Sequence, residues 1–260
     1  MAETNTDLLK ARLVLRAVLP LVKVLLEDDP KTKKKFEGVT ATVQFVAEDP
    51  DVGPVGSHVK FDNGAFEIVH ELAENPDLTF RFSSLAKMNA MFAGKPVLPK
   101  IQGFRNFGLL LKMLGVLMRL KLLMPDNAPK NPDEARLKVK LILYMVSTAL
   151  SQLNKGGDPD MVKWTSKQPE RIYQWSVEPD GIACYLRVKA GKTKAGRGYY
   201  TRRKPFVHMK FAGIEGALPV LTNKVDTVQA MTQGLVDNEG SPEYGGQVGD
   251  FMLKIAQMLT

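Results

Sequence analysis

The segment that decides the fold is Leu78-Thr79-Phe80-Arg81-Phe82-Ser83-Ser84-Leu85. It aligns without a gap with Val207-His208-Met209-Lys210-Phe211-Ala212-Gly213-Ile214. In both segments apolar side chains alternate with polar or small ones, which is typical of a β-strand with one buried face. Further along the same alignment Lys95 stands opposite Lys224. Because the pattern of elements around each segment is also alike, we interpret the chain as a tandem repeat.

The composition is that of an ordinary globular protein. The chain has 260 residues, of which 44% are hydrophobic and 25% charged, and this excludes a mainly disordered chain, a collagen-like fibre and a disulfide-rich miniprotein. The single cysteine, Cys184, forms no internal disulfide and alternates with Ile182 and Leu186, so we expect it in the core of a protein of the reducing cytoplasm. The net charge of +8 favours anionic partners.

Neither apolar segment of the chain predicts a signal peptide or a membrane span. The first residues are acidic, and Lys10, Arg12, Arg16 and Lys23 interrupt the apolar block that follows. Residues 107–124 contain three charges, which would cost about 8–10 kcal/mol in a bilayer, whereas the apolar residues there return only about 4–6. We expect a helix that is soluble or docks on a surface.

Each half predicts a helix, three strands, a fourth strand, a short helix, a short strand and a long helix. In the first half we expect a helix over 6–27, split by Pro20, and strands over 37–47, 59–61, 66–68, 78–82 and 97–103. In the second half we expect a helix from Pro132, capped by Asn131, to about 154, and strands over 161–166, 171–177, 182–188, 206–211 and 231–238. The closing helices are expected over 105–124 and 246–259. Residues 31–35 are expected to form a solvated basic loop, and the turn glycines Gly64 and Gly181 are expected to correspond.

The order and spacing of several short motifs resemble the sterol carrier protein-2 family. In the first half these are Val59-Lys60-Phe61-Asp62-Asn63-Gly64, Pro76-Asp77 before a strand, Gly94-Lys95 closing the short helix, and Lys100-Ile101-Gln102-Gly103. The second half keeps Glu178-Pro179-Asp180-Gly181 but has Pro205-Phe206 and Asn223-Lys224, and it carries insertions at about 190–204 and 225–245.

The resemblance implies an α+β fold of two similar sterol-carrier-like domains, 1–125 and 131–260, each a mostly antiparallel five-stranded sheet covered by helices, with 126–131 as the linker. It also implies an apolar tunnel that binds and carries or presents a sterol, fatty acid or acyl-CoA without catalysis or cofactor. The first half is expected to hold the better pocket. The expected lining residues are Phe80, Phe82, Met88, Met91, Phe92, Leu110, Leu114 and Leu117, and in the second half Met209, Phe211, Leu218, Leu221, Met252 and Ile255.

The helix 105–124 leaves three interpretations open. Arg105, Lys112 and Arg119 are seven residues apart on one stripe, and almost every other position is apolar. The apolar side chains of such a helix must be shielded from water on nearly every side. The helix is therefore buried in the core, forms the wall of a ligand cavity, or contacts a protein or a membrane.

A second basic cluster lies between residues 187 and 204, where eight residues are basic and none is acidic. It is either a solvated hairpin loop or a contact for an anionic membrane or headgroup, made by Lys189, Lys192, Lys194, Arg197, Arg202 and Arg203. No nucleic-acid motif is present.

The sequence offers no catalytic or metal-binding motif, because His58, His70 and His208 lack ligand spacing. Two alternatives to a lipid carrier remain. One is a scaffold or interaction protein, as a homo-oligomer or with an enzyme partner; the other is an enzyme or accessory component that acts on acyl-CoA or steroid substrates.

Overall fold

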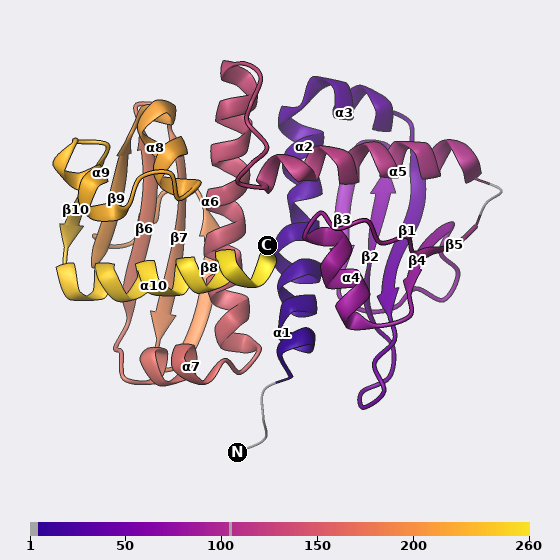
Figure 1. Ribbon diagram of the computed structural model, residues 1–260, viewed down its shortest axis with the longest axis horizontal. Coiled ribbons are helices and arrows are strands. Elements are labelled where there is room, and N and C mark those ends of the chain that lie inside the picture. The colour runs from indigo at the N-terminus through magenta and orange to yellow at the C-terminus, as the bar shows by residue number, and fades with distance from the viewer. Residues whose placement is uncertain (1–4, 104–105) are drawn as a thin grey trace. The chain divides into compact units, whose positions relative to one another are not determined.

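The computed structural model describes residues 5–103 and 106–260, which form two compact units, 5–124 and 125–258. Each unit is built on one five-stranded sheet (Figure 1). The N-terminal unit contains β1 (Thr40–Ala47), β2 (Val55–Asp62), β3 (Ala65–Val69), β4 (Leu78–Phe82) and β5 (Lys100–Gln102). The C-terminal unit contains β6 (Arg171–Glu178), β7 (Ile182–Lys189), β8 (Lys192–Arg197), β9 (Val207–Ala212) and β10 (Val236–Gly240). The predicted α+β class with two mostly antiparallel five-stranded sheets is confirmed.

The two sheets have the same topology. Their strand orders are β3-β2-β1-β4-β5 and β10-β9-β6-β7-β8, so the five strands of one unit correspond in chain order to the five strands of the other. In each sheet the two strands at the centre, β1 with β4 and β6 with β9, run parallel, and all other pairs are antiparallel. In chain order, a hairpin (β2–β3 or β7–β8) therefore comes between the two parallel strands, which are direct neighbours in the sheet.

The helices of the N-terminal unit are α1 (Thr6–Leu13), α2 (Val22–Asp28), α3 (Pro30–Phe36), α4 (Leu85–Phe92) and α5 (Phe107–Leu120). Pro20 lies in a 3-10 turn, preceded by a π turn, and these separate α1 from α2 as predicted. The sequence also offers Thr6 as a cap for this first helix, but the cap of α1 is Asn5, because the Asn5 side chain accepts the amide of Leu8.

The helices of the C-terminal unit are α6 (Pro132–Lys155), α7 (Pro159–Ser166), α8 (Gly213–Leu221), α9 (Thr227–Thr232) and α10 (Pro242–Leu259). The predicted cap of α6 is confirmed, since Asn131 accepts the amide of Glu134. Helix α6 packs on β7 and β8, and α8 packs on β6 and β9.

The gapless alignment of the two halves is confirmed in three dimensions over α4 and α8. Leu78 and Val207 occupy the same register position against β1 and β6. The two short helices end alike, because Gly94 and Asn223 both have positive φ, and the amides of Lys95 and Lys224 both bond five residues back.

Three helices lie where the sequence predicted other structures. Residues 30–36 form α3, capped by Asp29, and not a loop. Residues 159–166 form α7, capped by Asp158, and not a strand. Residues 227–232 form α9, capped by Asp226, so the last strand begins only at Val236. Each has an aspartate cap, and Pro30 and Pro159 take the first helical position, so local start signals outweigh apparent alternation in these short segments.

The third strand of the C-terminal unit, β8, lies in the segment expected to be a basic insertion. Ala190 and Gly191 make its turn with φ of 45° and 78°, as Asn63 and Gly64 do between β2 and β3 with φ of 45° and 92°. Gly64 therefore corresponds to Gly191. The expected match with Gly181 was wrong, because Gly181 lies in the β6–β7 turn.

A glycine at the end of the fifth strand is required in both units. Gly103 and Gly240 have φ of 93° and 103°, and a Cβ on either one would overlap the carbonyl oxygen of the residue before the fourth strand, Asp77 or Phe206. The end of the fifth strand can lie this close to the start of the fourth only because the glycine has no side chain.

Replacing Gly240 by alanine should lower the free energy of unfolding by about 3 kcal/mol, because it combines positive-φ strain with a backbone clash. Gly38→Ala is the control, since Gly38 has φ of 69° and open space around it and should lose only about 1 kcal/mol. Urea unfolding followed by circular dichroism measures both values, and equal losses in the two variants would contradict the close approach.

Candidate functional site

An apolar layer lines one face of the N-terminal sheet. Phe45 on β1 is paired in register with Phe80 on β4, and both are buried. Their rings stack at 4.9 Å between centroids, and the ring of Phe92 on α4 meets Phe45 edge-on at 5.9 Å. Figure 1 shows α4 and α5 over this sheet. The layer between helices and sheet is thus built of aromatic and aliphatic side chains.

The predicted lining residues of this half come from three elements. They are Phe80 and Phe82 on β4, Met88, Met91 and Phe92 on α4, and Leu110, Leu114 and Leu117 on α5. Phe80, Phe82, Met88 and Leu110 are buried, and Met91, Phe92 and Leu117 are partly buried. Leu114 is 43% exposed, so it does not belong to the buried set. Phe45 was missed, although the alternation of Val43, Phe45 and Ala47 in the predicted strand carries the signal.

The corresponding layer of the C-terminal unit is centred on Trp175 of β6, which occupies the register position of Phe45. It is paired with Met209 on β9, and Val177 is paired with Phe211. The predicted lining residues are Met209 and Phe211 on β9, Leu218 and Leu221 on α8, and Met252 and Ile255 on α10. Met209, Phe211 and Ile255 are buried, and Leu218, Leu221 and Met252 are partly buried. Trp175 itself was not predicted.

The indole nitrogen of Trp175 is a buried donor in this apolar layer. Within the described residues its Nε1 has no hydrogen-bond acceptor, and the side chain is 1% exposed. Trp164, the second tryptophan, instead donates to Oε1 of Gln247 at 2.7 Å. A buried donor without an acceptor costs about 1–3 kcal/mol, so a molecule that brings an oxygen to Trp175 would gain that amount.

A second aromatic group in the C-terminal unit packs around an arginine side chain of the protein itself. The guanidinium of Arg171 lies 4.0 Å from the ring centroid of Phe206 and 4.2 Å from that of Tyr244. The nearby Tyr173 hydroxyl donates to Gln168 at 2.5 Å, and burial raises the pKa of Tyr173. These cation–π contacts join β6 to α10, and we interpret the group as structural.

The opposite face of each central strand carries a buried glutamine. Oε1 of Gln44 accepts the amide of Ala73 at 2.7 Å, and Oε1 of Gln174 accepts the amide of Tyr200 at 2.8 Å. The two side chains hold equivalent loops after the third strands.

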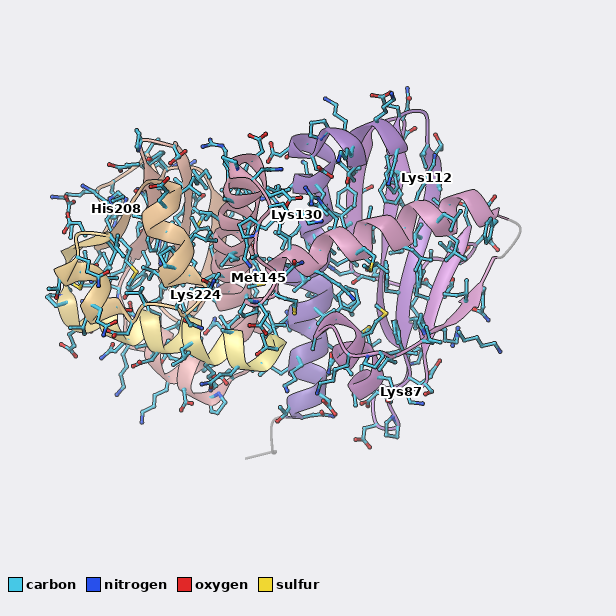
Figure 2. All side chains as sticks on the ribbon, turned by 45° about the horizontal axis from the view of Figure 1, so that its top comes forward. Lys87, Lys112, Lys130, Met145, His208 and Lys224 are labelled. Atoms are coloured by element: carbon cyan, nitrogen blue, oxygen red, sulfur yellow. The ribbon has the colours of Figure 1, made fainter. Side chains whose placement is uncertain are left out.

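His208 lies on the sheet of the C-terminal unit, as labelled in Figure 2.

His208, Ser176 and Glu178 form a chain of polar contacts that the sequence could not bring together. Ser176 Oγ lies 2.8 Å from Nε2 of His208 and donates to Oε1 of Glu178 at 3.0 Å. Burial lowers the pKa of His208, with a smaller effect from Lys210. In an acyl-transfer triad the imidazole stands between hydroxyl and carboxylate, whereas here the hydroxyl stands in the middle and Ser176 is fully buried. The arrangement is therefore unsuited to nucleophilic attack.

The other two histidines are held by neighbouring groups of the N-terminal unit. Nδ1 of His58 lies 2.7 Å from the carbonyl of Glu71, and Nδ1 of His70 lies 3.2 Å from Ser57 Oγ. Across the described residues no three His, Cys, Asp or Glu side chains gather as metal ligands.

The six predicted anionic-surface residues are all exposed: Lys189, Lys192, Lys194, Arg197, Arg202 and Arg203. Two of them share one carboxylate, because Lys189 and Arg203 lie 3.7 and 3.9 Å from Glu170. Lys192 and Lys194 lie on β8, an edge strand of the sheet. Lysine on an edge strand opposes edge-to-edge aggregation of sheets. These two charges therefore have a structural explanation that needs no bound membrane or headgroup.

Known proteins resemble this chain only in part. No protein-family model and no curated protein matches it. A solved protein from Thermus thermophilus, described as possibly a sterol carrier protein, is 18% identical over 44% of this chain and 86% of that one, with a TM-score of 0.32. The sterol carrier protein domain 2 of Helicoverpa armigera is 23% identical over 41% and 90%, with a TM-score of 0.28.

A stereoselective inverting sec-alkylsulfatase from a Pseudomonas species also aligns with the chain. It is 16% identical over 63% of this chain, with a TM-score of 0.26. The alignment spans only 28% of the sulfatase.

No helix among the described residues is both long and apolar enough to span a bilayer.

Cys184 should be unreactive in the folded protein. Its thiol is fully buried and donates to the carbonyl of Leu143 at 3.3 Å, and burial raises its pKa to about 12. Since the thiolate is the reactive form, labelling by Ellman's reagent at pH 8 should be at least about 1000-fold slower than in guanidinium chloride. Stopped-flow absorbance measures both rates, and fast labelling of the native chain would contradict this packing.

Proposed function

We propose that this protein binds a hydrophobic lipid-like ligand, a sterol, fatty acid or acyl-CoA, and carries or presents it without catalysis. The ligand would lie in the apolar layer between sheet and helices. The buried cysteine and the resemblance to sterol carrier domains are compatible with a cytoplasmic carrier.

The observation that carries the proposal is the unsatisfied Nε1 of Trp175 in the C-terminal unit. Most ligands of this class pair a long apolar body with one oxygen-bearing group. An indole donor within an apolar wall suits such a molecule, because it fixes the oxygen while the chain packs on Met209 and its neighbours. The sequence favoured the N-terminal half, but the equivalent position there is Phe45, which has no donor.

Methionine side chains support a ligand of variable shape. Met88 and Met113 are buried in the N-terminal unit, and Met161 and Met209 in the C-terminal unit. Unbranched thioethers adjust to different neighbours at low cost. A lipid tail gains about 0.8 kcal/mol for each buried methylene, so the apolar body supplies most of the affinity and the indole its orientation.

The proposal predicts that Trp175→Phe weakens binding of a fatty acid by roughly fivefold, the value of one hydrogen bond of about 1 kcal/mol. The affinity is measured by competition against a fluorescent fatty acid on the full chain. Trp164→Phe is the matched control, because its nitrogen is already bonded within the protein, and it should leave the affinity unchanged.

Two results would contradict the proposal. One is a purified chain that carries no extractable lipid by mass spectrometry and binds no fluorescent fatty acid. The other is equal loss of affinity in both tryptophan variants, which would indicate a general loss of packing.

A further inference from the structure

Helix α5 is apolar on its exposed side as well as on its buried side. Leu109, Leu110, Met113, Val116 and Leu120 face the core. Four further apolar side chains are exposed: Phe107 by 60%, Leu111 by 54%, Leu114 by 43% and Met118 by 61%. Their spacing of four, three and four residues puts all four on one stripe of the helix. A contiguous apolar stripe in solvent marks an interaction surface.

The segment of the sequence that contains this stripe is basic. Between Leu78 and Pro125 the sequence contains eight lysines and arginines and no acidic residue. Lys112 extends from α5 in Figure 2, and Lys121 is exposed just beyond its end. The stripe thus lies in a part of the chain that has basic residues and no acidic one.

Helix α3 adds charge directly beside α5. It carries the exposed Lys31, Lys33, Lys34 and Lys35, and it packs against α5. Nζ of Lys35 would lie 3.7 Å from a Cβ placed on Gly115, in the middle of α5. Gly115 therefore leaves room for a lysine from the neighbouring helix.

Basic residues on and beside these helices outnumber acidic ones by eight to four: Lys23, Lys31, Lys33, Lys34, Lys35, Lys112, Arg119 and Lys121 against Glu27, Asp28, Asp29 and Glu37. Asp29 caps α3 and lies 3.3 Å from Arg119 of α5. Glu27 lies 3.9 Å from Lys23. The charge presented around the stripe is consequently positive.

We infer that the surface formed by α3 and the exposed stripe of α5 docks on an anionic phospholipid bilayer. The apolar stripe would enter the headgroup boundary, and the lysines on α3, with Lys112 and Lys121, would meet the lipid phosphates and carboxylates. A second copy of the chain would not gain from this arrangement, since two such surfaces carry the same charge. The inference does not depend on what the apolar layers of the protein bind.

The test is co-sedimentation of the full chain with vesicles of 70% phosphatidylcholine and 30% phosphatidylserine. The chain should bind these vesicles, bind pure phosphatidylcholine at least about tenfold more weakly, and dissociate as salt is raised. Leu111→Ser with Met118→Ser should weaken binding at least about tenfold. Lys35→Gln with Lys112→Gln should weaken it about fivefold for each charge.

The matched control is Val228→Ser with Met231→Ser on α9, which removes two apolar side chains that are 74% and 48% exposed. It should leave vesicle binding unchanged. No binding by the unaltered chain, or equal loss in the α5 and α9 variants, would overturn the inference. So would a change from dimer to monomer in the α5 variant, measured by light scattering, without vesicle binding by the parent chain.

Fatty-acid affinity of the α5 variant, measured without vesicles, separates this inference from the proposed ligand. Unchanged affinity together with lost vesicle binding is the expected pair of results. Loss of both would assign the stripe to the ligand site and would contradict membrane docking.

Discussion

The parallel pairing at the centre of each sheet is the constraint on which the rest of the structure depends. Because β1 and β4, like β6 and β9, run in the same direction, the chain must return to the starting end of the sheet before the second strand. The antiparallel strands β2 and β7 make that return, β3 and β8 run forward again, and the segments 70–77 and 198–206 then bring the chain to the other side of the central strand. The short helix that follows β4 or β9 packs against the central strands. Phe45 with Phe80, and Trp175 with Met209, meet in register beneath that helix.

The two units use this frame differently. In the N-terminal layer the aromatic rings pack on one another: Phe45 and Phe80 stack, and the ring of Phe92 meets Phe45 edge-on. The C-terminal layer has a tryptophan at the same position, with a donor that finds no acceptor in the described chain. We propose that this difference in one side chain makes the C-terminal unit the place where a ligand's oxygen is held, while α5 gives the N-terminal unit its outward apolar surface.

Sequence patterns predicted the strands that are long and buried on one face, and the gapless match of the two halves from Leu78 to Lys95. They failed at α3, α7 and α9, where apolar residues are few and capping by Asp29, Asp158 and Asp226 decides the structure. Ser176 and His208 are far apart in the chain, so no local pattern could predict their contact. The lack of an acceptor for Trp175 Nε1 in the part of the chain that the structure describes depends on every residue packed around the indole, so no local pattern could predict that either. Leu114 was assigned to the cavity wall because periodicity does not separate the two apolar sides of α5.

The most direct test uses the only two tryptophans of the chain. In the Trp164→Phe variant Trp175 is the sole source of tryptophan fluorescence, and a fatty acid with a nitroxide near its carboxyl end quenches only at short range. Binding beside Trp175 predicts saturable quenching that unlabelled fatty acid reverses. Unquenched fluorescence at concentrations where the lipid is bound, or no binding at all, would contradict it.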